Sequence, residues 1–120
     1  MKADSDNLIV IKTKKFALEI IELYQYLVFD IKEFIISKQL LRCGTSIGAN
    51  VKEAIRGQSK ADFGSKMNIS LKEASETEYW LELLYESKIV PYSKVELLLL
   101  DCKELIRIIT AIVKTSFNNK

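Results

Sequence analysis

The most constraining feature of this sequence is the scarcity of residues that break helices. Its 120 residues include only four glycines and one proline. Apolar residues recur at steps of three and four, which is the period of an α-helix that buries one face. Long periodic stretches with few breaks favour a small number of long helices with short connections. We therefore predict an all-α chain in which sequential helices run antiparallel.

Four periodic stretches define the predicted helices. Thr13 is the expected N-cap of the first helix, and Ser59 with Asp62 forms a capping box at the start of the third. The second helix is expected to end before Gly57, and Pro91 marks the last turn. The predicted boundaries are 1–12 for a partly disordered lead-in, 13–116 for an up-down-up-down four-helix bundle and 117–120 for a polar tail.

The composition fits a globular helical domain. Hydrophobic residues make up 48% of the chain and charged residues 28%, a balance typical of folded proteins. Residues 1–7 lack the apolar region of a signal peptide, and charges interrupt every apolar run well before it could span a membrane. Cys43 and Cys102 lie in apolar helical stretches without metal-ligand spacing. We therefore expect a cytoplasmic protein with reduced, buried thiols, no membrane partner, no metal and no other cofactor.

The sequence offers little of the chemistry that enzymes use. It has no histidine, which is the commonest general base near neutral pH and the commonest metal ligand. Gly44 and Gly48 lie in a glycine-rich stretch, but the lysine and preceding strand of a phosphate-binding loop are missing. These glycines instead indicate close approach by another helix. We expect no catalytic residues; an enzyme that uses Glu78 with Arg42 is the alternative.

Glu78 is unusual because the periodicity of the third helix puts it inside the apolar stripe, between Leu71 and Tyr85. A buried carboxylate needs a partner, and the second helix offers Arg42 and Asn50 as donors. We predict a buried polar network of Arg42, Asn50 and Glu78 that fixes the register of the two helices. A ligand site at the same residues is the alternative.

A basic stripe follows one side of the second predicted helix. It consists of Lys38, Arg42, Lys52 and Arg56, and Lys60 follows in the chain. Such a stripe could track a phosphate backbone, although the formal net charge of +2 is too small by itself to indicate nucleic acid. The alternatives are an ordinary solvated face and ion pairs with glutamates of the third helix. We predict a surface for structured RNA or DNA at these five residues.

The third and fourth predicted helices carry more apolar surface than one core requires. A helix of a monomeric bundle needs about one apolar face, so a second apolar face indicates a second buried contact. An identical subunit supplies that contact most simply, and Trp80 is the aromatic anchor expected there. The predicted subunit interface consists of Ile69, Trp80, Leu83, Leu97, Leu100 and Ile108.

Two segments of the sequence resemble a known family. The first is residues 39–54, QLLRCGTSIGANVKEA; the second is residues 59–63, SKADF, with residues 69–84, ISLKEASETEYWLELL. They resemble the four-helix-bundle family of 23S rRNA intervening-sequence proteins, which is related to the accessory variability determinant (Avd) proteins of diversity-generating retroelements. The resemblance extends over nearly the whole chain.

The resemblance implies a bacterial protein whose up-down-up-down bundles assemble as a homopentameric ring. It also implies that the retroelement relatives bind nucleic acid and a reverse transcriptase through a basic surface. We therefore predict a non-catalytic homo-oligomeric scaffold, expected as a pentamer, with structured RNA or DNA as a candidate ligand. A protein-protein interaction adaptor that binds no nucleic acid is the alternative. The family's motif positions, for which no catalytic role is implied, fall on Arg42, Thr45, Ser46, Ile47, Asn50, Glu53, Glu73, Glu76, Thr77, Tyr79 and Trp80.

Overall fold

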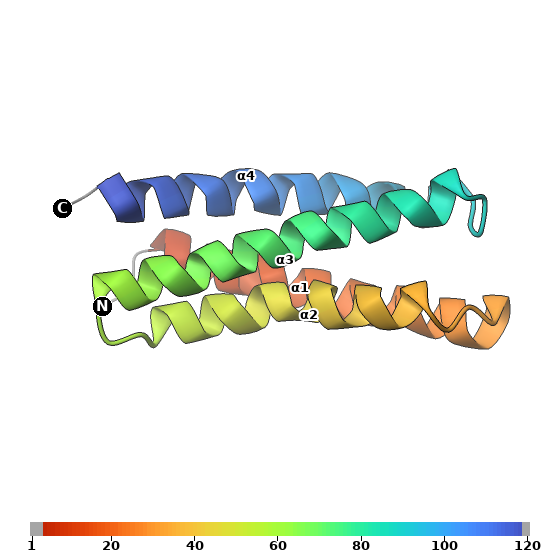
Figure 1. Cartoon of the computed structure of the whole chain (residues 1–120), viewed down its shortest axis with the longest axis horizontal. Coiled ribbons are helices and arrows are strands. Elements are labelled where there is room, and N and C mark those ends of the chain that lie inside the picture. The colour runs from red at the N-terminus through yellow and green to blue at the C-terminus, as the bar shows by residue number, and fades with distance from the viewer. Residues whose placement is uncertain (1–3, 119–120) are drawn as a thin grey trace.

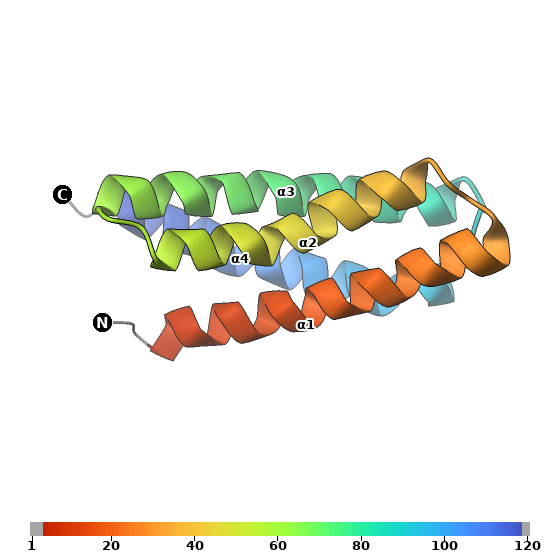
Figure 2. The ribbon, with the colours of Figure 1, turned by 90° about the horizontal axis from the view of Figure 1, so that it is seen from below.

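The computed structural model describes residues 4–118, which form four long α-helices packed side by side (Figures 1 and 2). Successive helices run in opposite directions along a body of 48 × 22 × 20 Å. This architecture confirms the predicted antiparallel four-helix bundle. None of the helices in residues 4–118 is both long enough and apolar enough to cross a membrane. The elements are α1 (Asp4–Tyr26), the π-helical turn η1 (Leu27–Ile31), α2 (Ile36–Ile55), α3 (Lys60–Glu86), the 3-10 turn η2 (Tyr92–Lys94) and α4 (Glu96–Asn118).

Helix α1 begins earlier than predicted, at Asp4. The expected N-cap, Thr13, lies inside the helix, where its hydroxyl donates to the carbonyl of Ile9 at 2.8 Å. Ile9 is buried, so the core-facing side of α1 starts one turn before the predicted helix does. A threonine whose hydroxyl bonds within its own helix can occupy a core position, and the N-cap prediction is therefore wrong. The parts of the predicted lead-in and tail in residues 1–3 and 119–120 lie outside the described residues.

Glu33 fixes the connection between α1 and α2. Before it, Lys32 ends η1 with a left-handed backbone, φ 67°. The Glu33 carboxylate then accepts hydrogen bonds from three backbone N–H groups, those of Ile35 at 3.1 Å, Ile36 at 2.9 Å and Ser37 at 2.7 Å. Partial burial raises the pKa of Glu33, but these bonds outweigh it and leave the pKa below its ordinary value. One carboxylate thus accepts hydrogen bonds from three backbone N–H groups at the start of α2 that have no partner within the helix.

The start of α3 matches half of the predicted capping box. The Ser59 hydroxyl accepts from the N–H of Asp62 at 3.0 Å, as predicted. The Asp62 carboxylate accepts from the N–H of Gln58 at 3.4 Å instead of from Ser59. Gly57 follows the C-cap residue of α2 without adopting a positive φ. The turn between α2 and α3 is therefore closed by side-chain caps rather than by a left-handed glycine.

All four helices contribute to one core. Helices α2 and α3, α1 and α2, and α3 and α4 pack extensively in pairs, whereas α1 and α4 pack much less against each other. Cys43 and Cys102 are both fully buried free thiols, as predicted, and burial raises their pKa values to about 11 and about 12. The largest fully buried side chains are Ile9, Phe16, Ile20, Leu27, Leu40, Ile47, Val51, Met67, Leu81, Leu84, Leu105 and Ile109.

The core-facing side of α3 contains two hydroxyl side chains. Ser70 and Thr77 are fully buried. Ser70 donates across to the carbonyl of Ile47 in α2 at 2.9 Å, and Thr77 donates within its own helix. Leu71 and Tyr85, which the predicted stripe included, are only partly buried. The prediction counted only apolar residues. It therefore assigned Leu71 and Tyr85 to the core-facing side of α3 and overlooked Ser70 and Thr77.

Helices α1 and α2 approach closely at the two glycines of α2, as predicted. A Cβ atom on Gly44 would lie 2.9 Å from both the Cγ1 and Cγ2 atoms of Ile20. A Cβ atom on Gly48 would lie 3.1 Å from the Thr13 hydroxyl oxygen. Ile20 is fully buried and branched at Cβ, so it has little freedom to move aside. The missing side chains therefore set the spacing of these two helices.

Gly44→Ala is expected to lower the free energy of unfolding despite the better helix propensity of alanine. Overpacking a core costs about 1–3 kcal/mol, whereas replacing a helical glycine by alanine gains at most ~1 kcal/mol. Urea unfolding at fixed protein concentration measures the difference. Gly64→Ala is the control, because its added Cβ would meet the rotatable hydroxyl of Ser116 at 2.7 Å and the edge of the half-exposed Phe117 ring at 3.2 Å, both of which can move aside. A Gly44→Ala variant at least as stable as the parent would contradict the proposed close packing.

Candidate functional site

The basic stripe of α2 is exposed along most of its length. Lys38, Lys52 and Arg56 are exposed and form no ion pair with another described side chain. Lys38 and Arg56 are separated by about 27 Å along the chain direction, at the helical rise of ~1.5 Å per residue. The one acidic residue of α2, Glu53, is paired with a lysine of α3 at 2.9 Å. Lys60 is exposed at the start of α3.

Arg42 differs from the other residues of the stripe because it is ion-paired. Its guanidinium lies 3.3 Å from the Glu73 carboxylate and also donates to Glu76, both on α3. The indole N–H of Trp80 donates to the same Glu76 carboxylate at 3.0 Å. These two donors, Trp80 first and then Arg42, hold the pKa of Glu76 below its ordinary value. For Arg42 the alternative interpretation, ion pairing with glutamates of the third helix, is correct.

The predicted buried network of Arg42, Asn50 and Glu78 does not form among the described residues. The Asn50 amide donates to the carbonyl of Ser46 in its own helix at 2.9 Å. Glu78 has a side chain 27% exposed and pairs with Lys103 of α4 at 2.5 Å. Glu78 follows the true core residue Thr77 and points toward α4, whereas Arg42 contacts the other side of α3. The structure therefore does not bring together the two residues of the alternative enzyme hypothesis.

A groove of about 260 Å³ lies between α1 and α2, beside the basic stripe. Its α2 wall includes Lys52, and its α1 wall includes Lys14, an exposed lysine that forms no ion pair with another described side chain. Sequence reasoning missed Lys14, because the stripe was traced along a single helix and only the packing brings α1 beside it. The lining residues are Val10, Thr13, Lys14, Ala17, Thr45, Gly48, Ala49 and Lys52.

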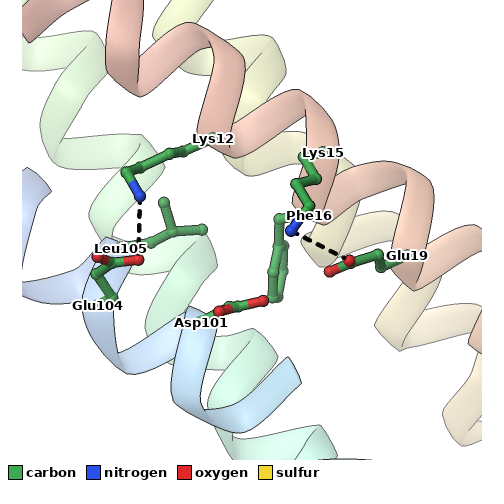
Figure 3. Close-up of a pocket in the computed structure, with 7 residues that line it drawn as sticks. All are labelled: Lys12, Lys15, Phe16, Glu19, Asp101, Glu104 and Leu105. Carbon is green, nitrogen blue, oxygen red and sulfur yellow. Dashed lines mark hydrogen bonds and ion pairs between the residues drawn. The ribbon is translucent and has the colours of Figure 1, made fainter. Parts of the chain in front are cut away.

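A smaller pocket of about 50 Å³ lies between α1 and α4 (Figure 3). Lys12 reaches across it to Glu104 at 3.4 Å, and Lys15 pairs with Glu19 at 3.6 Å. The volume accommodates a few water molecules rather than an organic substrate. Among the side chains that the structure describes, no group of three or more carboxylates, thiols or imidazoles could hold a metal ion. The pocket is lined by Lys12, Lys15, Phe16, Glu19, Asp101, Glu104 and Leu105.

The six predicted interface residues divide into two patches. We call Ile69, Trp80 and Leu83 the α3 patch; they lie on the side of α3 that carries Glu76, the partner of Arg42 in α2. In this patch Ile69 is 38% exposed, whereas Trp80 and Leu83 are partly buried. The α3 patch therefore borders the edge of the bundle where α2 and α3 meet.

The second patch, the α4 patch, comprises Leu97, Leu100 and Ile108. Leu97 is 74% and Leu100 55% exposed, and Ile108 packs partly against the core. A hollow of about 300 Å³ beside Leu97 is shared with residues of α1. The α4 patch therefore borders the edge where α1 and α4 meet. Because the helices neighbour one another in chain order around the bundle, the two patches lie on opposite edges.

Helix α1 also carries exposed apolar side chains outside the core. Leu8, Ile11 and Leu18 are 50%, 63% and 56% exposed. They were not predicted, because the first helix was assigned one apolar stripe and its outer face was not considered. The α1–α4 edge thus combines the weakest packing between neighbouring helices with the exposed leucines of the α4 patch.

Comparisons with known proteins agree with this fold. Residues 5–111 match the family described as 23S rRNA-intervening sequence protein. The structure is similar to the 1.70 Å crystal structure of a protein of unknown function from the S23 ribosomal protein family of Bacteroides thetaiotaomicron VPI-5482. The two share 49% sequence identity and a TM-score of 0.89, over 92% of this chain and 99% of that chain. No curated protein matches this chain significantly.

The fluorescence of Trp80, the single tryptophan, is expected to report the protonation of Glu76. The lowered pKa of Glu76 means that the fold favours the charged carboxylate. The resulting stabilisation is complete above the ordinary pKa of 4.5 and is lost as the pH falls through the lowered value. Emission recorded from pH 7 down to pH 2 should therefore change with a midpoint below 4.5.

Two conservative variants test this assignment. Glu76→Gln should abolish the emission change, whereas Glu73→Gln should retain it, because only Glu76 accepts from the indole N–H. Circular dichroism over the same range separates a local titration from acid unfolding. A midpoint at or above 4.5, or an unchanged transition in Glu76→Gln, would show that Trp80 does not sense this carboxylate.

Proposed function

This chain belongs to the 23S rRNA-intervening sequence protein family, and on that premise we propose that it is a non-catalytic, homo-oligomeric scaffold that binds structured RNA or DNA. The proposed ligand surface is the exposed basic stripe of α2 with Lys60. The proposed subunit contact joins the α3 patch of one copy to the α4 patch of the next. The family resemblance implies a pentamer in a bacterium, and the two buried free thiols favour the cytoplasm.

The observation that carries the assembly is the position of two unlike apolar patches on opposite edges of one bundle. A two-fold interface pairs one patch with itself, whereas unlike patches pair head to tail. Head-to-tail contacts close into a ring when the rotation between subunits permits. Trp80 gives the α3 patch a large, partly buried aromatic side chain of the kind that anchors interfaces.

The nucleic-acid half of the proposal rests on cations that have no partner within the described chain. Lys38, Lys52, Arg56 and Lys60 remain available for phosphate, whereas Arg42 is neutralised by two carboxylates. Only a few cations per subunit are available, so a single subunit would bind weakly. Repetition of the stripe in an oligomer would raise the affinity by increasing the effective concentration of contacts.

A protein-interaction adaptor is the second candidate, and a separate observation favours it. Phe29, Phe34 and Ile35 are 66%, 56% and 76% exposed in and next to the connection between α1 and α2. Large apolar side chains clustered at one end of a bundle are typical of protein contacts. An adaptor would be insensitive to nucleic acid, whereas phosphate binding weakens steeply as salt rises.

The subunit contact can be tested with complementary variants. Leu97→Glu with Leu100→Glu disables the α4 patch, and Ile69→Glu with Leu83→Glu disables the α3 patch. Each double variant alone should be monomeric in analytical ultracentrifugation, because every head-to-tail contact needs both patches. An equimolar mixture should form heterodimers that grow no further, since each variant contributes one intact patch.

The matched control for the assembly test is Ser75→Glu, an exposed position elsewhere on α3, which should assemble as the parent does. Circular dichroism checks that every variant is folded. A parent protein that stays monomeric at high concentration would overturn the oligomer. Double variants that still dimerise alone, but fail to pair when mixed, would overturn the head-to-tail arrangement.

RNA retention is expected to depend on the exposed cations of α2 and not on charge in general. Lys52→Glu with Arg56→Glu should abolish the shift of structured RNA in a native gel while leaving the oligomer intact. Lys72→Glu with Lys114→Glu makes the same charge change at exposed positions of α3 and α4 and should retain most binding. For the parent, raising salt from 50 to 200 mM should weaken binding by about 10³-fold if roughly six phosphates are contacted.

Equal binding by both double variants, or no binding by the parent, would refute the proposed binding of nucleic acid.

A further inference from the structure

The groove between α1 and α2 is kept open by small side chains. Gly48 adds no side chain to the lining. Ala17 and Ala49 line the walls with single methyl groups. The resulting volume of about 260 Å³ opens directly beside Lys52 of the basic stripe. The groove is therefore a continuation of that stripe with an apolar lining.

The hydroxyl groups in the groove have no proton left for a ligand. Thr13 donates to the carbonyls of Ile9 and Val10, at 2.8 and 3.2 Å. Thr45 donates to the carbonyl of Leu41 at 2.7 Å, with a longer contact to the next carbonyl. The remaining side-chain donors of the lining are the ammonium groups of Lys14 and Lys52.

These two ammonium groups determine what the groove can recognise. An ammonium group acts as a compact point charge and attracts an anion without a fixed hydrogen-bonding pattern. Base edges are read by arginine or lysine at guanine and by asparagine or glutamine at adenine. The groove lining contains no arginine, asparagine or glutamine, and its two lysines lie on different helices, where they act as separate point charges. The lining therefore suits a ligand that combines negative charge with a carbon-rich surface.

We propose that this groove holds a stretch of the sugar–phosphate backbone of nucleic acid and reads no base sequence. Phosphates lie at Lys14 and Lys52, and sugar carbons pack on Val10, Ala17 and Ala49. This inference rests on the proposed nucleic-acid binding and adds the path of the strand and the basis of its recognition. Phosphate contacts of this kind fix position but carry no sequence information.

The charges outside the groove favour a nucleic-acid strand over an acidic protein helix. Lys38 and Arg56, which have no ion-pair partner among the described side chains, continue the line of cations along α2 beyond both ends of the α2 wall of the groove. A phosphodiester strand presents regularly spaced charges along such a line. A docked helix would instead present apolar side chains to an apolar groove, whereas this lining includes two lysines and is continued by cations at both ends. An acidic helix is nevertheless the competing occupant that the experiment must distinguish.

The experiment measures RNA binding by fluorescence anisotropy over a salt series. The probes are two labelled RNAs of equal length and base composition with different sequences. Lys14→Ala removes a groove charge outside the α2 stripe, and Ala49→Phe fills the groove without changing charge. Lys72→Ala and Ser75→Phe make the same types of change at exposed positions of α3. All variants are compared at the same oligomeric state.

The parent is expected to bind both RNAs within about twofold of each other. The logarithm of the affinity falls linearly with the logarithm of the salt concentration. Lys14→Ala should make this fall less steep, by roughly 0.7–0.9 in slope for each groove occupied, because one phosphate contact is lost. Ala49→Phe should weaken binding at least about tenfold because the sugar can no longer enter the groove. The two α3 controls should bind like the parent.

The outcomes separate this inference from the function on which it rests. No RNA binding by the parent overturns both. Binding that depends on Lys52 and Arg56 but is unchanged in Lys14→Ala and Ala49→Phe overturns the groove and leaves the proposed function standing. A preference above about tenfold for one RNA overturns sequence-independent recognition. An acidic helical peptide that binds the parent but not Ala49→Phe, while RNA binding is unaffected, assigns the groove to a protein.

Discussion

Where α1 meets α2, the side chain of Ile20 packs against the bare backbone of Gly44, and Thr13 lies against Gly48. This close contact sets the spacing of the first two helices, and α2 in turn packs extensively against α3. A fully buried leucine or isoleucine contributes about 1.5–3 kcal/mol, whereas an exposed ion pair contributes roughly 0–1 kcal/mol. The surface pairs of Arg42 and Lys103 therefore adjust helix register in a bundle that core packing already holds together.

The number, order and direction of the helices could be predicted from the sequence, because apolar periodicity and the scarcity of glycine and proline are strong local signals. The errors arose where a polar residue occupies a core position. Thr13, Ser70 and Thr77 are buried with their hydroxyls bonded to backbone carbonyls, and an apolar pattern does not register such residues. The late start assigned to α1 and the burial assigned to Glu78 both follow from that omission.

The candidate site was predictable only in part, because it depends on which helices become neighbours. The α2 cations could be found from their spacing on one helix. The pairing of Arg42 with Glu73 and Glu76 requires α3 to lie beside α2, and the role of Lys14 requires α1 to lie on the other side. Neither contact is local in sequence. A surface of five cations was therefore predicted, whereas in the structure one of them, Arg42, is paired with carboxylates, and Lys14 of α1 lies beside the others.

The poor packing between α1 and α4 has a thermodynamic consequence. A bundle with one weak edge loses its local order there first, since that edge has the fewest buried contacts to break. The same edge exposes the apolar side chain of Leu97 beside α1. A molecule that covers this edge recognises a surface that exists only when both helices are in place, so it binds the folded chain. By mass action, a molecule that binds only the folded chain shifts the folding equilibrium toward the folded state. If a second copy is the cover, folding and association share one equilibrium, and the melting temperature of this chain would rise with its concentration.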